Sequence, residues 1–204
     1  MAINKEFKLL EESILSTLGI KYSGLRWCEL GDQIYYGPPP CAAKKIYTKC
    51  GVLHTSIDIN GLNGSIALDL DQPIPSNFID SFDVVTNYGT TEHINNQYEV
   101  FKSIHNMCKC SGVILHGVPL IFNWAKHCRY YYTKDFFAQL AKLCNYSVVD
   151  LRILNSNSYL VPKNLVVSVY RKVDNSPFIS KELFDSIPGI YDSKFINASG
   201  CKRG

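Results

Sequence analysis

Residues 82–119 read FDVVTNYGTTEHINNQYEVFKSIHNMCKCSGVILHGVP, and this stretch decides the fold. It begins with an apolar strand pattern and continues through a polar loop (87–93) into an amphipathic helix, a turn at Gly112 and a second strand. Two strands joined by a helical crossover form the unit of a parallel sheet. In such sheets the loops at the carboxyl ends of the strands line the binding crevice. The loop 87–93 is therefore predicted to line a binding site.

The composition is that of one globular domain. The chain has 204 residues, of which 46% are hydrophobic and 19% charged. Its net charge of +3 is small and its basic residues form no cluster larger than pairs such as Lys44-Lys45, so nothing indicates a nucleic-acid partner. No apolar run approaches the roughly 20 residues that span a bilayer, and charge from Lys5 onward argues against a signal peptide. We therefore expect no membrane partner and a cytoplasmic location.

The eight cysteines favour free thiols over disulfides. Cys28, Cys108 and Cys144 fall inside expected strands or helices, and reduced thiols are the rule in the cytoplasm. No pair has the CxxC spacing of a zinc site, and Cys108 and Cys110, one residue apart, lack partners at the expected offsets. The sequence therefore predicts no metal site.

The rest of the chain alternates between strand and helix patterns. Further strands are expected at 25–31, 54–59, 148–154 and 165–171, with a very short strand or extended chain at 65–70. Helices are expected at 3–18, 133–145 and 180–186, and the irregular, proline-containing segment 32–53 has room for one short helix near 42–48. The link from 60 to 64 is too short for a crossover helix, so the helix between the second and third strands is missing.

These patterns predict an α/β fold with three layers and a mostly parallel sheet to which one antiparallel strand is added. We expect one domain over residues 1–173, in which 1–19 forms an N-terminal helix that covers the core. Residues 174–204 are expected to form a C-terminal tail with one short helix and little other order.

Several short segments follow one another in a particular order. The first strand ends in Glu29-Leu30-Gly31, the second in Asp58, and the apolar run 65–70 contains Asp69. Then come Phe82-Asp83-Val84-Val85, Glu92-His93-Ile94 and Ser111-Gly112-Val113-Ile114-Leu115. Over residues 25–170 this order resembles a class I S-adenosylmethionine-dependent methyltransferase, of the small single-domain type with a Glu-His pair after the fourth strand. The resemblance implies a Rossmann-like sheet and S-adenosylmethionine as cofactor.

The resemblance also implies roles for individual residues. Asp58 would accept hydrogen bonds from both ribose hydroxyls, since each carboxylate oxygen can accept one, and Asp69 would contact the adenine amino group. Asn87 and Gly89 would lie against the methionine part of the cofactor. Each position has a structural alternative: Asp58 and Asp69 also fit turns, Asp71 could replace Asp69, and Glu92 also fits the start of a helix.

The chain departs from the family's acid–x–Gly–x–Gly loop after the first strand. Glu29 and Gly31 match, but Gln33 replaces the second glycine, and Gly37-Pro38-Pro39-Pro40 displaces the helix that should follow. The resemblance keeps Glu29, Gly31 and Gln33 as cofactor-binding candidates, with Gln33 or Asp32 in reach of the cofactor's amino or carboxylate groups. The same departure fits a non-catalytic, methyltransferase-like binding or scaffold protein with a degenerate cofactor site. The absence of Gly-x-Gly-x-x-Gly argues against a nicotinamide-dependent oxidoreductase.

For the acceptor, the resemblance places His116, Trp124 and Tyr130 near the mouth of the cleft as substrate-binding candidates. His93 and His127 are the candidate general bases, because transfer to an oxygen or nitrogen can require removal of a proton. His127 also fits an exposed loop, and the aromatic residues also fit a core under that loop. The small size favours a small-molecule acceptor, a metabolite or sugar-like compound.

Overall fold

The computed structural model describes residues 2–3, 5–124, 126–155 and 163–195. Its centre is a seven-stranded sheet with the strand order β10-β11-β8-β7-β2-β5-β6. The strands are β2 (Arg26–Leu30), β5 (Leu53–Asp58), β6 (Ile66–Ala67), β7 (Phe82–Asn87), β8 (Cys108–Pro119), β10 (Tyr146–Leu154) and β11 (Leu165–Lys172). Among them, β11 alone runs antiparallel to its neighbours. The prediction of one antiparallel strand is confirmed, and that strand lies between β8 and β10.

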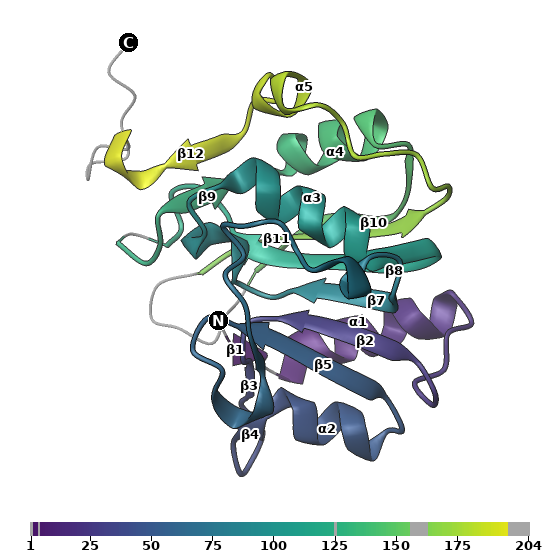
Figure 1. Ribbon diagram of the computed structural model, residues 1–204. Coiled ribbons are helices and arrows are strands. Elements are labelled where there is room, and N and C mark those ends of the chain that lie inside the picture. Colours follow the sequence, from purple (N-terminus) through teal and green to yellow (C-terminus); the bar gives the residue numbers. More distant parts are fainter. Residues whose placement is uncertain (1, 4, 125, 156–162, 196–204) are drawn as a thin grey trace.

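Helices cover both faces of this sheet (Figure 1). Helices α1 (Lys5–Thr17) and α2 (Ala43–Lys49) pack on one face, and α3 (Gln97–Met107), α4 (Lys134–Leu143) and α5 (Lys181–Asp185) pack on the other. Each face buries its own cluster of large side chains, centred on Trp27 and Tyr47 beneath α1 and α2, and on Phe101 and Phe136 beneath α3 and α4. The predicted three-layer α/β sandwich is confirmed. Between β5 and β6 the chain forms only the 3-10 turn η1 (Leu62–Gly64), so the crossover helix is missing as expected.

The unit 82–119 forms the predicted strand, helix and second strand. Asn96 is the N-cap of helix α3, and its side chain accepts a hydrogen bond from the backbone N–H of Glu99 at 3.2 Å. The turn expected at Gly112 does not precede the second strand, because β8 already begins at Cys108. Gly112 instead lies where the chain passes close to itself: a Cβ there would approach the Cys108 Sγ to 2.6 Å.

Two further small sheets are not evident from the sequence. Strands β1 (Ala2–Ile3), β3 (Ile34–Tyr35) and β4 (Cys41–Ala42) form one, which orders part of the segment 32–53. Strands β9 (Tyr130–Tyr132) and β12 (Ile190–Asp192) form the other. The expected helix of the tail is present as α5, but the expectation of little other order is wrong for 174–195, since β12 is paired and Ile179 and Ile187 are buried.

A buried acid fastens α1 to the loop that follows β7. Glu11 accepts hydrogen bonds from Lys8 Nζ at 2.6 Å and from the hydroxyls of Tyr22, Tyr47 and Tyr88 at 2.8, 2.7 and 2.8 Å. Burial and the Glu11 carboxylate raise the pKa of the Tyr47 and Tyr88 hydroxyls well above the usual value, so both remain donors. We call these five residues the Glu11 cluster. Because Tyr88 directly follows β7, the cluster fixes one end of the loop predicted to line the binding site.

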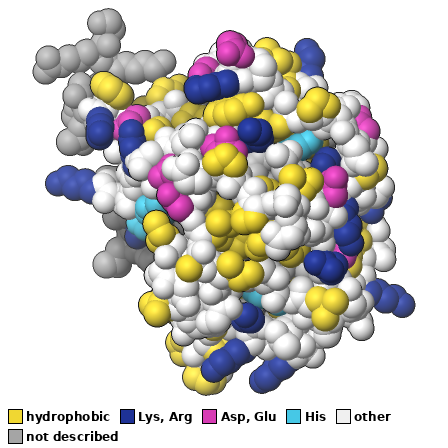
Figure 2. Space-filling view, viewed as in Figure 1, with side chains coloured by type: hydrophobic (Ala, Val, Ile, Leu, Met, Phe, Trp, Pro, Cys, Tyr) yellow, Lys and Arg dark blue, Asp and Glu magenta, His cyan; other side chains and the backbone are white. Residues whose placement is uncertain are grey.

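Surface features agree with the small net charge. Lys and Arg side chains are scattered over the face seen in Figure 2 and are interspersed with acidic ones. None of the helices in the described ranges combines the length and apolar character needed to cross a membrane. The seven cysteines of the described part are free, and Cys201 lies outside it.

Candidate functional site

A pocket of about 380 Å³ opens at the carboxyl ends of β2, β5 and β7. The chain moves from β2 to β5 on one side and later to β7 on the other, so this is the switch point where open α/β sheets bind ligands. The volume falls within the roughly 300–1,000 Å³ typical of small-molecule sites. Six predicted site residues line the pocket: Gly31, Gln33, Asp58, Asp69, Gly89 and His93.

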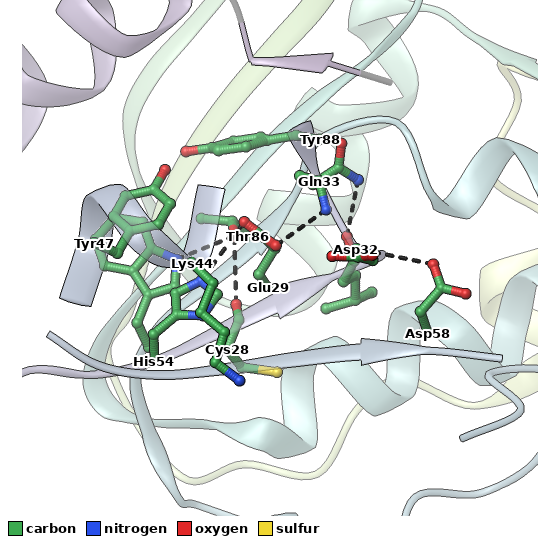
Figure 3. Close-up of polar contacts among 12 residues, drawn as sticks. Cys28, Glu29, Asp32, Gln33, Lys44, Tyr47, His54, Asp58, Thr86 and Tyr88 are labelled. Carbon is green, nitrogen blue, oxygen red and sulfur yellow. Dashed lines mark hydrogen bonds and ion pairs between the residues drawn. The ribbon is translucent and has the colours of Figure 1, made fainter. Parts of the chain in front are cut away.

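Asp58 ends β5 and bridges two backbone segments (Figure 3). One carboxylate oxygen accepts from the backbone N–H of Asp32 at 3.0 Å, and the other accepts from that of Asn60 at 3.0 Å. The bond from Asn60 is the turn-capping contact that was the structural alternative for Asp58 in the sequence. Since each carboxylate oxygen can accept a second bond, the same geometry leaves Asp58 able to accept donors from the pocket.

The two acids after β6 have different surroundings. Asp71 accepts from the backbone N–H of Asn96 at 2.6 Å and from the side-chain amide of Asn95 at 3.2 Å, so it holds the start of α3. Asp69 accepts one bond, from the backbone N–H of Asp71 at 2.9 Å. Asp69 is therefore the acid with more capacity for a ligand, although both residues line the pocket.

The loop after β2 contains the residue that replaces a glycine. Gly31 has a left-handed φ of 83°, and a Cβ there would come within 2.6 Å of both Gln33 Nε2 and Thr90 Oγ1. The Gln33 amide donates to the Leu30 carbonyl at 3.2 Å and to Thr90 Oγ1 at 3.3 Å. The Gln33 side chain therefore folds across Gly31. Its Oε1 is buried and has no hydrogen-bond partner among the described residues.

Glu29 lies behind this loop and does not line the pocket. Its carboxylate accepts from the backbone N–H of Gln33 at 3.2 Å and lies 3.6 Å from His54 Nε2 (Figure 3). The side chain is 1% exposed, and this burial raises its pKa. Glu29 thus holds the backbone of the loop after β2 from the side away from the pocket. Its predicted role at the cofactor would be indirect, through the position of Gln33.

Asn87 and His116 are both buried beside the loop after β7. Asn87 Oδ1 accepts from the backbone N–H groups of Thr90 and Thr91 at 3.2 and 3.1 Å, and its amide lies 3.0 Å from His116 Nδ1. His116 is 2% exposed and packs 5.1 Å from the Phe137 ring, and burial lowers its pKa to about 3. The placement of His116 at the cleft mouth is wrong, because its position in β8 points into the core. Asn87 shapes the loop, and Gly89 carries that loop to the pocket.

Beside the pocket, the turn η3 (Thr91–His93) presents Glu92 and His93. Glu92 is fully buried, and neither carboxylate oxygen has a hydrogen-bond partner in the part of the chain that the structure describes. Burial raises the pKa of Glu92 to about 7. The helix-start role considered for Glu92 is not observed, since Asn96 caps α3.

His127 approaches this turn from the loop before β9. Its ring centroid lies 5.6 Å from that of His93, and His93 Nε2 lies 4.0 Å from Glu92 Oε1. Burial lowers the pKa of both histidines, and for His93 the neighbouring His127 lowers it further. The structure therefore brings the two predicted bases together, with a buried acid beside them.

The two remaining substrate candidates, Trp124 and Tyr130, do not line the pocket. The Trp124 ring is 5.0 Å from His127, and its Nε1 donates to the Asn164 carbonyl at 2.6 Å. The Tyr130 hydroxyl donates to the Asn95 carbonyl at 3.2 Å. The pocket also contains residues that the sequence did not single out, namely Ile57, Ile59, Leu68 and Leu70. The sequence signal that could have identified them is their position next to predicted site residues in the chain.

Comparison with known proteins identifies the fold. No protein-family model matches the sequence, and no curated protein does. Solved structures do match: 1,6-didemethyltoxoflavin-N1-methyltransferase of Burkholderia thailandensis, with bound 1,6-didemethyltoxoflavin and S-adenosylhomocysteine, has a TM-score of 0.59. Its sequence identity is 14%, over 80% of this chain and 76% of that chain.

Two other structures show how widely this fold is used. The 16S rRNA (adenine(1408)-N(1))-methyltransferase of Catenulisporales acidiphilia has a TM-score of 0.52 and 10% identity, over 81% of this chain and 94% of that chain. The cyclase SpnF has a TM-score of 0.58 and 10% identity, over 81% of this chain and 80% of that chain. The chain therefore has the fold of class I S-adenosylmethionine-dependent methyltransferases, as predicted. The acceptor is not common to these neighbours.

Proposed function

We propose that this protein is an S-adenosylmethionine-dependent methyltransferase that acts on a small-molecule acceptor, a metabolite or sugar-like compound. The observation that carries the proposal is the convergence of Asp58, Asp69, Gly31 and Gly89 on one pocket at the switch point of the sheet. Two carboxylates at the ends of neighbouring strands suit the hydroxyl and amino donors of a nucleoside, and the glycines allow the backbone to approach it.

In this proposal each wall of the pocket binds a different part of the cofactor. Asp58 accepts the ribose hydroxyls, and Asp69 accepts the adenine amino group, while Leu68 and Ile94 provide apolar contact for the base. Gly31 and Gly89 lie against the methionine part. The Gln33 oxygen, buried without a partner among the described residues, accepts from the cofactor's ammonium group.

The cofactor supplies an activated methyl group, and the protein positions an acceptor in line with it. His93 lines the pocket and His127 lies next to His93, so these neutral rings are the proposed acceptors of the proton that the substrate loses. Trp124 and Tyr130 would contact the substrate only where it extends past His127.

Several features support a small acceptor. The pocket has the size of a small-molecule site, and basic side chains are not gathered on the face seen in Figure 2. The Burkholderia thailandensis neighbour binds a small molecule, whereas the Catenulisporales acidiphilia neighbour acts on rRNA. We propose the cytoplasm as the location, which the free thiols favour.

Calorimetric titration with S-adenosylhomocysteine tests the cofactor site, with a nicotinamide dinucleotide as the negative ligand. We expect micromolar binding of the first and none of the second. Asp58→Asn should weaken binding by about 100-fold, because two hydrogen bonds to a charged acceptor contribute about 3 kcal/mol. Asp135→Asn, at an exposed position of α4, is the matched control. Equal affinity in Asp58→Asn and the parent, with both folded by circular dichroism, would contradict the proposal.

A non-catalytic binding protein is the second candidate, and the folding of Gln33 across Gly31 favours it. Incubation of small-molecule extracts with methyl-labelled donor separates the two candidates. Label transferred to an acceptor supports the enzyme, and at a donor concentration near the parent's dissociation constant the transfer should fall sharply in Asp58→Asn, whose cofactor binding is weakened. Binding of S-adenosylhomocysteine without label transfer supports the binding protein.

A further inference from the structure

We propose that Glu92, His93 and His127 together bind one divalent transition-metal ion at the rim of the pocket. One ligand atom from each residue lies within 4.8 Å of the others. The sequence did not predict this site, because 34 residues separate His93 from His127 along the chain. The fold brings them together.

Three hydrogen bonds hold the loop before β9 close to η3. The Arg129 N–H donates to the Glu92 carbonyl at 3.2 Å, which joins the loop to η3. Within the loop, the Trp124 carbonyl accepts from the His127 N–H at 3.1 Å and from the Tyr131 hydroxyl at 2.5 Å. The backbone of His127 is therefore held near Glu92 by bonds that its imidazole ring does not make.

The spacing suits a metal after a small adjustment. Ligands about 2.0–2.1 Å from a tetrahedral metal lie roughly 3.4 Å apart, so the three atoms must close by little more than 1 Å. The side chain of His93 is 47% exposed and His127 is also exposed, so rotation of both rings can supply this closure. The buried Glu92 stays in place and determines the position of the ion.

The Glu92 carboxylate is an independent indication of a ligand. It is fully buried, yet neither oxygen has a hydrogen-bond donor within the described ranges of the chain. Burying a carboxylate without a partner is costly, and buried charges are generally paired or coordinate metals. The two nearest nitrogen ligands belong to His93 and His127, on the side where the cluster is open to solvent.

The donor set indicates which ions would bind. Two imidazoles and one carboxylate suit Zn²⁺, Co²⁺, Mn²⁺ or Fe²⁺, whereas Mg²⁺ and Ca²⁺ prefer oxygen ligands alone. Three protein ligands leave at least one coordination position open, as in catalytic metal sites. His93 belongs both to this cluster and to the pocket lining, so the open position lies beside the pocket.

This placement deepens the proposed function, on which its catalytic part rests. With the ion bound, His93 and His127 act as ligands and not as free bases. An acceptor hydroxyl at the open position would have its pKa lowered by the ion and would lose its proton to solvent water before the transfer, which favours a hydroxyl-bearing acceptor over an amine. Metal binding itself requires no cofactor, so the two proposals can fail separately.

The test uses the full chain without a polyhistidine tag, stripped with chelator and titrated with Zn²⁺, Co²⁺ and Mg²⁺ in the absence of cofactor. We expect one equivalent of Zn²⁺ or Co²⁺ and no Mg²⁺. His127→Ala and Glu92→Gln should each weaken Zn²⁺ binding at least about tenfold, the lower bound set by losses at residues that only support a ligand. Cys50→Ser/Cys110→Ser, which removes two exposed thiols, should retain the equivalent.

The visible spectrum of the Co²⁺ form reports the ligands directly. Bands of a nitrogen and oxygen site, without a thiolate-to-cobalt band, should appear and should be lost in His127→Ala. Absence of Zn²⁺ and Co²⁺ binding in the folded parent overturns the metal site. So does binding that persists in His127→Ala and Glu92→Gln but disappears in Cys50→Ser/Cys110→Ser. S-adenosylhomocysteine titration of the same samples then shows whether the cofactor site survives on its own.

Discussion

Three acids in the described part of the chain are almost completely buried, Glu11 and Glu29 at 1% exposure and Glu92 at 0%, and the surroundings of Glu11 and Glu92 are opposite. Glu11 accepts from one ammonium group and three tyrosine hydroxyls. Glu92 accepts from no donor in the described part of the chain and faces two histidines. A buried charge that is fully hydrogen-bonded stabilises a fold, whereas one left without donors is retained for another reason. The difference sets the structural acid Glu11 apart from Glu92, which we propose as a metal ligand.

Glu11→Ala should give the largest effect. It leaves the buried Lys8 with only the half-exposed Glu12, at 3.4 Å, as counter-charge and leaves three hydroxyls without their acceptor, and breaking a buried pair costs about 3–5 kcal/mol. Urea denaturation should show this loss in the free energy of unfolding. Glu12→Ala is the control, because the Glu12 side chain is 48% exposed, and it should change stability by less than about 0.5 kcal/mol. A loss as small in Glu11→Ala would remove the distinction between the two acids.

Low pH should destabilise the fold through two buried histidines, His105 and His116. His105 Nε2–H donates to the Ser176 carbonyl at 2.9 Å, its Nδ1 lies 2.6 Å from the Tyr146 hydroxyl, and burial lowers the pKa of His105 to about 4. The unfolded chain, with a histidine pKa near 6.5, binds more protons below that pH. Stability is therefore full above about pH 6.5 and falls as the pH drops towards 4.

Lowering the pH from 7.5 to 5.5 should reduce the free energy of unfolding by about 1.3 kcal/mol through His105. His116, whose pKa is lowered to about 3, should contribute a similar loss. Urea midpoints at the two pH values measure the loss. The loss of stability in His105→Gln should be smaller than in the parent by about 1.3 kcal/mol, because the opposing contribution of Glu92, whose pKa of about 7 favours folding as the pH falls, is the same in both proteins. An unchanged slope in that variant would show that His105 does not titrate as the structure indicates.

Glu92→Leu should have the opposite sign to Glu11→Ala. Replacing an unpaired buried acid by an apolar residue of similar size should stabilise the metal-free chain by about 1–2 kcal/mol. The measurement is urea denaturation in the presence of chelator. Destabilisation by more than about 1 kcal/mol would mean that Glu92 has a donor which stabilises the fold, and the contrast with Glu11 would disappear.

Gln33→Ala should give the smallest effect. Like Glu92, Gln33 carries a buried oxygen without a partner among the described residues. If this oxygen accepts from the cofactor's ammonium, its loss should weaken S-adenosylhomocysteine binding by about three- to tenfold, close to 1 kcal/mol. Calorimetry measures the change. Tighter binding in Gln33→Ala would instead show that the side chain obstructs the site, as the binding-protein alternative holds.

The sequence by itself determined the sheet and the order of its loops. Apolar periodicity places strands and helices within a few residues, because burial on one face of an element leaves a regular trace. Asp58, Asp69 and Gly89 follow strands directly, so their meeting at one edge of the sheet follows from topology alone.

Tertiary structure decided which polar side chains are satisfied. Periodicity reports that a position is buried but not which distant residue lies opposite, so neither the partners of Glu11 nor the burial of His116 could be predicted. His127 lies in the loop before β9, and β9 is held in place by pairing with β12 of the C-terminal tail. The approach of His127 to Glu92 and His93 therefore depends on a strand pair between distant segments. Contacts between segments far apart in the chain carry no local pattern, and for that reason only the folded structure revealed them.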